Sequence, residues 1–363
     1  TLGPLDTNSE WNALNVLAAS LWHPYSTTRE QERNRLTYNS QVTGFLEWKI
    51  LDGLAFKTSL SATYGGVRYH SFWNSVRNYG YPGGDTQPAE GKYKTNQSFN
   101  WVTENTLNYN KTFGDHSVTG LLGYTVQENK YEDSNILSAS FPNNAVKTLN
   151  AGKPQTAEST ATEWALISYL ARATYAYQGK YLASASIRTD GSSRFGANSR
   201  WGYFPSASIG WRISEESFLK DTEWLDNLKV RASYGVTGNN QIDDYAAIGL
   251  LKYDSYTLGG KVIQGIYTEN FPDKDLRWER TSQVNVGLDA SFFHQRLNLA
   301  IDYYHSVTND LLLNVPIPAI TGFTSNLTNI GKLQNKGLEI SLTSVNIKGP
   351  FEWSTNFNIS GNR

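Results

Sequence analysis

The sequence of 363 residues has no cysteine, no methionine and only five histidines. The lack of cysteine excludes disulfides, thiolate metal sites and a cysteine nucleophile, but it does not identify a compartment. No run of 18 apolar residues occurs, so the sequence predicts no membrane-spanning helix. No signal peptide is recognisable at Thr1, and we expect an export signal upstream of this residue.

Sequence signals for catalysis are weak. The five histidines lie far apart, without the paired spacing of a helical zinc site: His23, His70, His116, His294 and His305. The sequence also has no phosphate-binding loop, dinucleotide fingerprint or nucleophile elbow. We therefore expect no enzyme and no catalytic residue.

Charge and hydropathy exclude further classes. The 32 basic and 33 acidic residues give a formal charge of -1, so we expect no nucleic-acid partner. Only 39% of the residues are hydrophobic, 13% are aromatic, and the mean hydropathy is -0.49. A membrane barrel with a wet lumen accommodates these values, because only one face of each strand has to be apolar.

Alternation with a period of two runs along the chain and predicts β-strands. Val42, Gly44, Leu46 and Trp48 share one face of the first strand, and the turn at Asp52-Gly53 starts a second. The pattern predicts about twelve strands, at 38–50, 54–64, 97–110, 117–130, 164–177, 180–190, 203–213, 228–237, 278–293, 297–312, 335–345 and 351–361.

Short and long connections alternate between these segments. The short ones are predicted at 51–53, 110–116, 178–179, 214–227, 294–296 and 346–350. The long ones are predicted at about 70–96, 131–163, 191–202, 238–277 and 313–334. Outer-membrane barrels have short periplasmic turns and long extracellular loops, so the rhythm predicts a transmembrane barrel and assigns a side to each end.

Aromatic residues flank several of the short turns, namely Trp48, Phe56, Tyr175, Tyr177, Tyr181, Phe351 and Trp353. Tyrosine and tryptophan favour the headgroup level of a membrane, which suggests an aromatic girdle. The alternative is that they form ordinary cross-strand pairs of a soluble sheet.

Four stretches carry a family resemblance. They are IRTDGSSRFGANSRWGYFPSASIGWRISEESFL at 187–219, LKVRASYGVTGNNQI at 228–242, DLRWERTSQVNVGLDASFFHQRLNLAIDYYHSVTNDLL at 275–312 and NIGKLQNKGLEISL at 329–342. Together they resemble the SusC/RagA family of TonB-linked outer-membrane transporters, from about residue 165 onward.

The residues of the first stretch indicate a structural role. Arg188 and Arg194 are expected to pair with Asp190 at the rim, and Pro205 stands at a strand start. In the strand that contains Pro205, every second residue is expected to face lipid, and the residues between them are expected to face the lumen. The lipid stripe is Ala207, Ile209, Trp211 and Ile213, and the lumen set is Ser206, Ser208, Gly210 and Arg212.

The resemblance implies an all-β, antiparallel transmembrane β-barrel in the bacterial outer membrane, with about 12 strands of a 22-stranded barrel supplied by this chain. Residues 1–363 would all belong to the barrel domain, and we expect the N-terminal plug domain to be absent from this sequence. The implied function is active import of oligosaccharides or peptides. The implied partners are a SusD-like surface lipoprotein, the TonB-ExbB-ExbD complex acting through the unseen plug, and outer-membrane lipid.

Substrate contacts are expected in the long loops, because aromatic rings with polar tips suit sugars and peptide side chains. The candidates are Trp73, Tyr79, Tyr81 and Tyr93 in one loop and Tyr253 and Tyr256 in another. The alternative is that these rings pack the loops together. No cofactor is expected, although the loop acids Asp243, Asp244, Asp273 and Asp275 include oxygen ligands of the kind that Ca²⁺ takes.

Three other functions are left open. A siderophore- or cobalamin-type TonB-dependent receptor would share the fold, and a passive porin or structural barrel would share the hairpins. A soluble all-β carbohydrate-binding or enzymatic domain would need two packed apolar faces.

Overall fold

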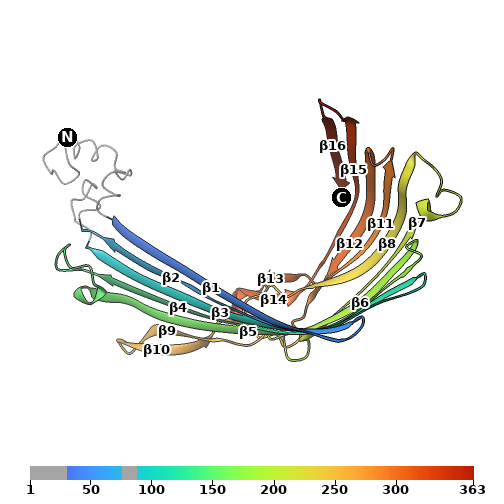
Figure 1. The fold of residues 1–363 in the computed structure, drawn as a ribbon. Helices are drawn as coiled ribbons and strands as arrows, with labels where there is room; N and C mark the ends of the chain where they lie inside the picture. The colour runs from blue at the N-terminus through green and yellow to red at the C-terminus, as the bar shows by residue number, and fades with distance from the viewer. Residues whose placement is uncertain (1–30, 76–87) are drawn as a thin grey trace. The chain divides into compact units, whose positions relative to one another are not determined.

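The computed structural model describes residues 31–75 and 88–363 (Figure 1). Within these residues, twelve strands are hydrogen-bonded in the order β1-β2-β3-β4-β5-β6-β7-β8-β11-β12-β15-β16. The strands are β1 (Gln31–Leu51), β2 (Leu54–Trp73), β3 (Glu90–Phe113), β4 (His116–Ala139), β5 (Lys153–Tyr177), β6 (Tyr181–Ser192), β7 (Trp201–Arg212), β8 (Leu225–Asn239), β11 (Glu279–Phe292), β12 (Leu297–Asn309), β15 (Lys332–Ile347) and β16 (Trp353–Asn362). The predicted all-β antiparallel sheet of about twelve strands is confirmed.

Two small hairpins and three short helices complete the described elements. The hairpins are β9 (Leu251–Leu258) with β10 (Lys261–Thr268), and β13 (Leu312–Pro316) with β14 (Ser325–Asn329). The 3-10 helices are η1 (Leu149–Ala151), η2 (Ile213–Glu215) and η3 (Ala319–Thr321). In the described part of the chain, no helix has the length and apolarity that crossing a membrane would require.

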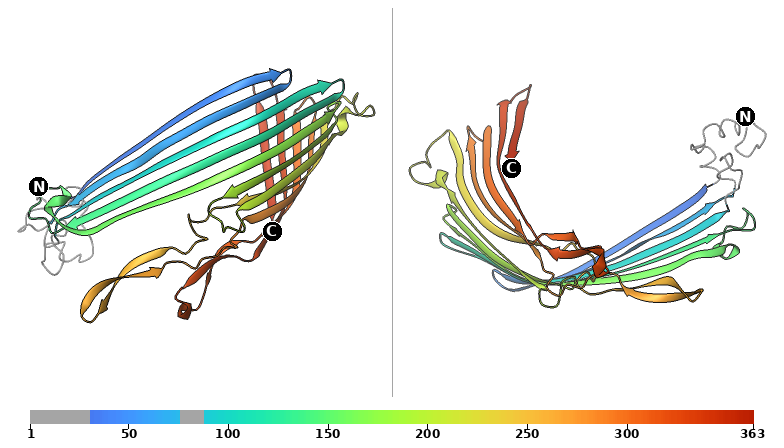
Figure 2. Two further views of the ribbon diagram at one scale, coloured as in Figure 1. Left: turned by 90° about the horizontal axis from the view of Figure 1, so that it is seen from below. Right: turned by 180° about the vertical axis from the view of Figure 1, so that it is seen from behind.

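The chain divides into two compact units. The first consists of the described residues of 1–43, 61–101 and 128–163, and the second of residues 44–60, 102–127 and 164–363. Figure 2 shows that, in the second unit, the β9–β10 and β13–β14 hairpins leave the strand ends that also carry the long connections.

Strands β1 to β5 are longer than predicted, at 20 to 25 residues each. Residues 90–96, 131–139 and 153–163 form strand, where the sequence pattern predicted loop. Polar pairs extend the ladder in the first unit, including Ser98 with Asn129 and Lys94 with Asp133. Because a strand outside the membrane needs no apolar face, the hydropathy signal ends before the backbone pairing does.

In the second unit, the register separates an apolar face from a polar one. Ala207 pairs with Ala185 and Tyr234, and Ile301 pairs with Leu288 and Ile340. The alternate positions carry the polar set, including Ser184, Ser186, Ser206, Ser208, Lys229, Arg231, Asn285, Asp289 and Asp302. The predicted stripe of Ala207, Ile209 and Trp211 lies on the apolar face and is exposed, whereas Ile213 belongs to η2.

Aromatic rings border the apolar face at both ends. Near the short turns, the Tyr181 ring stacks with Tyr177 and Trp211, with centroids 6.3 and 6.5 Å apart. Near the long connections, Tyr169 contacts Tyr124 and Trp201 at 5.2 and 6.1 Å. Trp201 and Trp211 are ten positions apart on β7, which corresponds to roughly 25 Å across a membrane at a tilt of about 40°. The spacing matches the apolar band of an outer-membrane barrel.

The short turns adopt left-handed backbone conformations at the predicted places. Gly53 has φ of 80°, and Gln178 and Gly179 have φ of 52° and 65°. Glycine tolerates positive φ without steric cost, so the chain can reverse within two or three residues. The predicted turns at 51–53 and 178–179 are confirmed.

The connection between β7 and β8 is held by Glu216. Its carboxylate accepts hydrogen bonds from the Tyr181 hydroxyl at 2.6 Å and from Trp211 Nε1 at 3.0 Å, and it pairs with Lys180 at 3.6 Å. The hydrogen bond from Tyr181 is the main reason that the pKa of Glu216 lies below its ordinary value. These contacts therefore stabilise the ionised form of the Glu216 carboxylate.

We predict that Glu216→Gln lowers the thermal stability of the protein at pH 7 but not at low pH. A carboxyl whose folded-state pKa is depressed stabilises the fold above its unfolded pKa, near 4.3, and loses this contribution as pH falls through the folded value. The measurement is the midpoint of thermal unfolding of both proteins between pH 7 and pH 3. A difference that stays constant with pH would contradict the assignment.

Candidate functional site

A buried cluster joins the long connections of the second unit. It consists of Phe195, Phe204, Val236, Ala247, Leu276 and Trp278, and we name it the loop core. The Trp278 ring contacts Phe195 and Phe204 at centroid distances of 5.0 and 5.3 Å, and its Nε1 donates to the Arg200 carbonyl at 2.9 Å. The motif stretches at 187–219 and 275–312 therefore meet in one packed structure.

Gly196 allows this close packing. Its amide donates to the Leu276 carbonyl at 3.2 Å, and a Cβ on Gly196 would overlap the backbone of Lys274. Any side chain at this position must push the two connections apart.

We predict that Gly196→Ala destabilises the loop core by about 1–3 kcal/mol, the usual cost of overpacking. The expected result is faster proteolysis within residues 240–277 while the strands remain folded. Gly349→Ala is the matched control, because nothing lies within 4 Å of a Cβ there. Equal cleavage rates in the two variants would contradict the prediction.

Two arginines beside the loop core form ion pairs with aspartates. Arg188 Nε donates to both carboxylate oxygens of Asp190, at 2.8 and 2.9 Å. Arg194 donates instead to Asp244 at 2.8 Å and lies over the Trp164 ring at 4.8 Å. The predicted pair of Arg188 and Asp190 is confirmed, whereas the pair of Arg194 and Asp190 is wrong. Arg188 already occupies Asp190, and Asp244 lies on the connection that packs over Arg194.

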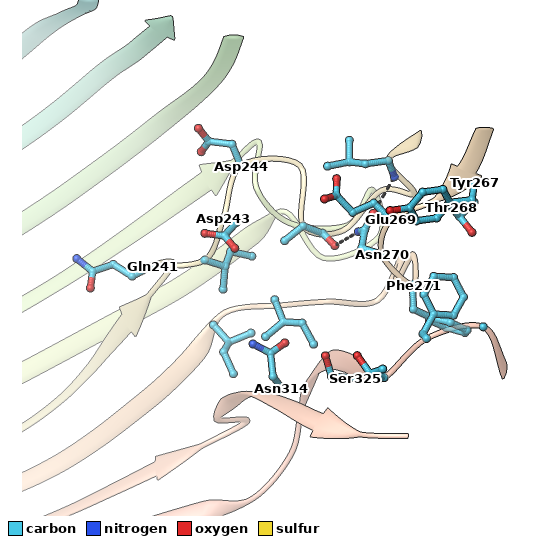
Figure 3. Close-up of a pocket in the computed structure, with 18 residues that line it drawn as sticks. Gln241, Asp243, Asp244, Tyr267, Thr268, Glu269, Asn270, Phe271, Asn314 and Ser325 are labelled. Atoms are coloured by element: carbon cyan, nitrogen blue, oxygen red, sulfur yellow. Dashed lines mark hydrogen bonds between the residues drawn. The ribbon is translucent and has the colours of Figure 1, made fainter. Parts of the chain in front are cut away.

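A cavity of about 710 Å³ lies between the two hairpins and the connection that follows β8, and we name it the loop pocket. Figure 3 shows its labelled residues on three separate segments: Gln241, Asp243 and Asp244; Tyr267 to Phe271; and Asn314 with Ser325. Ile242, Leu312, Phe323 and Leu327 add apolar surface. The mixture of carboxylate, amide, hydroxyl and aromatic groups suits an oligomeric ligand with both polar and apolar parts.

Asn270 fixes one wall of the loop pocket. Its Oδ1 accepts a hydrogen bond from the Leu250 amide at 2.7 Å, and its Nδ2 donates to the Ala246 carbonyl at 3.3 Å (Figure 3). Nδ2 also donates to the Ile248 carbonyl at 2.8 Å. Glu269 pairs with Lys252 at 3.0 Å, and this hydrogen bond raises the Lys252 pKa. The Phe271 and Phe323 rings meet edge to face at 5.7 Å.

The polar face of the second unit carries a charged network. Arg231 Nη2 donates to Asp302 at 2.7 Å, Nε donates to Asp289 at 3.1 Å, and Nη1 donates to Asn285 at 3.2 Å. The guanidinium lies over Gly287, where a Cβ would meet it. The network gives this face positively and negatively charged groups that hydrogen bonds hold in place.

Comparisons with known proteins agree over nearly the whole chain. Residues 2–363 match the family of TonB dependent receptor-like β-barrels. The chain belongs to the TonB-dependent receptors. It is 39% identical to a TonB-dependent receptor of Formosa agariphila over 94% of its own length and 33% of the relative's. It is 34% identical to the TonB-dependent receptor SusC of Bacteroides thetaiotaomicron, over 82% of this chain and 29% of that one.

Among solved structures, the RagAB peptide transporter superposes with a TM-score of 0.86 at 28% identity, covering 94% of this receptor chain and 37% of the other. The chain thus spans about a third of the length of the relatives it matches. These similarities show a SusC/RagA-type receptor barrel of the outer membrane, a family of receptors rather than enzymes.

The predicted substrate-contact residues of this receptor fall in different places. Trp73 lines a groove of the first unit, under the Arg33 guanidinium at 5.7 Å. Tyr93 stands between two groove residues on β3, so its side chain lies on the other face. Tyr79 and Tyr81 lie outside the described residues.

Tyr253 and Tyr256 are exposed on β9 and do not line the loop pocket. The pocket is lined instead by Glu269 and Phe271, which follow β10, and by Asn314 and Phe323 of the β13–β14 hairpin. Neither hairpin was predicted from the sequence. A weak signal was present, since both long connections contain short alternating runs that are typical of hairpins.

The loop acids do not gather. Asp244 is paired with Arg194, and Asp275 accepts a hydrogen bond from Asn198 at 3.1 Å. Across residues 31–75 and 88–363, no three histidine or acidic side chains cluster so as to hold a metal ion.

Proposed function

We propose that the complete receptor actively imports oligopeptides across the outer membrane. The observation that carries the proposal is the superposition on the RagAB peptide transporter, with a TM-score of 0.86 over 94% of this chain. The loop pocket supports it, because a cavity of about 710 Å³ with carboxylate, amide and aromatic groups accommodates several residues of a peptide. Oligosaccharides are the alternative polymer.

The architecture supports an orientation for this import. The end with the loop core and the loop pocket faces outside, where a SusD-like surface lipoprotein would close over it and deliver ligand. The short turns face the periplasm. A plug domain outside this chain, pulled by TonB-ExbB-ExbD, would open a path along the polar face with Arg231, and further strands would complete a barrel of about 22.

Two other transport functions make different predictions. A siderophore- or cobalamin-type receptor would need a compact site for one small ligand, whereas the loop pocket is open and bordered by three segments. A passive porin would need no energy coupling. The first alternative differs from the proposed import in the ligand and partner that co-purify with the receptor, and the second differs because its uptake would not depend on energy.

The test is affinity purification of the full-length receptor from its native outer membrane, followed by mass spectrometry of proteins and small ligands. We expect a surface lipoprotein in stoichiometric amount and bound peptides. A preparation without a lipoprotein, or one that carries a siderophore, would overturn the proposal. Bound oligosaccharides would show that the substrate is an oligosaccharide rather than a peptide, and the proposed energised import would be retained.

A further inference from the structure

A second cavity lies on the first unit, on strands β1, β2 and β3. Its volume is about 630 Å³, and its lining is Arg35, Val67, Tyr69, Ser71, Trp73, Glu90, Lys92, Lys94 and Asn96. We name it the strand groove. All of these residues lie on described strands.

The strand groove is locally cationic although the chain is nearly neutral. Arg35, Lys92 and Lys94 line it with a single acid, Glu90, whereas the whole sequence has a formal charge of -1. Lys94 contacts Asp133 at 3.4 Å, and its side chain stays 43% exposed. The positive charges of Arg35 and Lys92 outnumber the acid of the groove and can attract an anionic ligand.

One nearby acid is engaged outside the groove. Glu32, on the same strand as Arg35, forms an ion pair with Lys147. The hydrogen bond from Lys147 lowers the Glu32 pKa, so the carboxylate stays ionised and engaged with its own partner. Arg33 adds positive charge beside the groove, over the Trp73 ring.

The groove is also fixed in shape. The Asn96 side chain accepts the Val67 amide at 3.1 Å, which ties β3 to β2 at the groove wall. Trp73 is held by the Arg33 guanidinium at 5.7 Å, a distance at which a cation and an aromatic face attract each other. Tyr69 and Ser71 add hydroxyl groups to the lining.

The spacing of the cations favours a peptide. Lys92 and Lys94 are alternate residues of β3, so their Cα atoms lie roughly 7 Å apart along the strand. An extended peptide presents alternate side chains on one face at the same interval. Two acidic side chains at positions i and i+2 of a bound peptide would thus reach successive cations.

We propose that the strand groove binds acidic oligopeptides through alternating carboxylates, with Lys92 and Lys94 as their contacts, Arg35 as a further cation and Trp73 as an apolar platform. This rests on the proposed peptide import and deepens it, because it names a preference within that substrate class. The charge-assisted hydrogen bonds that form are stronger than neutral ones.

The experiment measures fluorescence polarisation of labelled nonapeptides with the full-length receptor purified together with its partner. One peptide carries glutamates at two alternate positions, one carries them at adjacent positions, and one carries glutamines at the alternate positions. We expect the alternating glutamate peptide to bind about tenfold more tightly than the glutamine peptide at low salt. The advantage should shrink as salt is raised, since screening weakens exposed charge pairs.

Lys92→Gln and Lys94→Gln should each remove most of the tenfold preference, and Lys92→Arg should retain part of it. Arg68→Gln is the matched control, because Arg68 lies on β2 between two groove residues and faces the other side. Binding of the glutamine peptide should be equal in all variants, which shows that each variant is folded.

The outcomes separate the two proposals. Equal binding of the glutamate and glutamine peptides, or variants without effect, would overturn the strand groove proposal and leave peptide import intact. Binding of neither peptide, with binding of oligogalacturonate instead, would overturn both the acidic-peptide site and the peptide substrate class.

Discussion

Replacing Ala207 by arginine should destabilise the membrane-inserted receptor by about 2–4 kcal/mol, the cost of a charge at the midplane of the lipid face of a barrel. Ala207 lies midway between Trp201 and Trp211 on β7, and its neighbours across the strands are Ala185 and Tyr234 on the apolar face. The measurement is a urea titration of folding into lipid vesicles, followed by heat-modifiable migration.

Two variants control for this result. Ser206→Arg places the same charge one residue away on the polar face, where water reaches it, and should cost less than about 1 kcal/mol. Ala207→Leu should be neutral or slightly stabilising, because its side chain enters lipid rather than a packed interior. Equal effects of arginine at 206 and 207 would contradict the assignment of the two faces.

Replacing Trp278 by alanine should open the loop core while the strands stay paired. Trp278 is 5% exposed, contacts two aromatic rings and donates to the Arg200 carbonyl. Removal of a buried tryptophan costs about 3–5 kcal/mol, which corresponds to a roughly 150- to 5000-fold larger open population. Limited proteolysis of residues 240–277 should accelerate accordingly.

Trp224→Ala provides the control for that experiment. Trp224 is exposed near the short turns and stacks on Phe292, so its removal should leave cleavage of residues 240–277 unchanged. Trp278→Phe should give an intermediate rate, since it keeps part of the packing and loses the hydrogen bond. Protection equal to that of the unsubstituted receptor in Trp278→Ala would show that the loop core does not organise these connections.

The strands and their faces were predictable because side chains alternate with a period of two. Val42 to Trp48 and Ala207 to Trp211 alternate apolar and polar residues in the sequence. For Ala207 to Trp211 the register places each set as expected. The turn at Asp52-Gly53 was predictable because few residues accept positive φ. Strand alternation and turn formation depend only on residues that are close together in the sequence, so a single sequence is enough to predict them.

The long ends of β1 to β5 and the loop pocket were not predictable in the same way. Residues 131–139 pair through polar side chains, without the hydropathy contrast that marks a membrane strand. The loop pocket brings Asp243, Phe271 and Asn314 together from separate segments. The choice of Asp244 as the partner of Arg194 likewise depends on tertiary packing, since several acids were available at similar sequence distance.

The aromatic candidates illustrate the limit of composition as a guide to binding. Trp73 lies in a groove with Arg35 and Lys92, whereas Tyr253 and Tyr256 are exposed on a hairpin outside the loop pocket. A ring suits a ligand only where other groups converge on the same space. The path of the backbone, rather than the residue type, determines which side chains surround the same space.

If this chain forms the wall of an energised peptide importer, uptake of peptides must depend both on the receptor and on the proton-motive force. The most direct test is uptake of a labelled peptide mixture by cells with and without the full-length receptor, each measured before and after a protonophore collapses the proton-motive force. We predict uptake that requires the receptor and stops with the protonophore. Receptor-dependent uptake that continues without a proton-motive force would indicate a passive pore and contradict energised import.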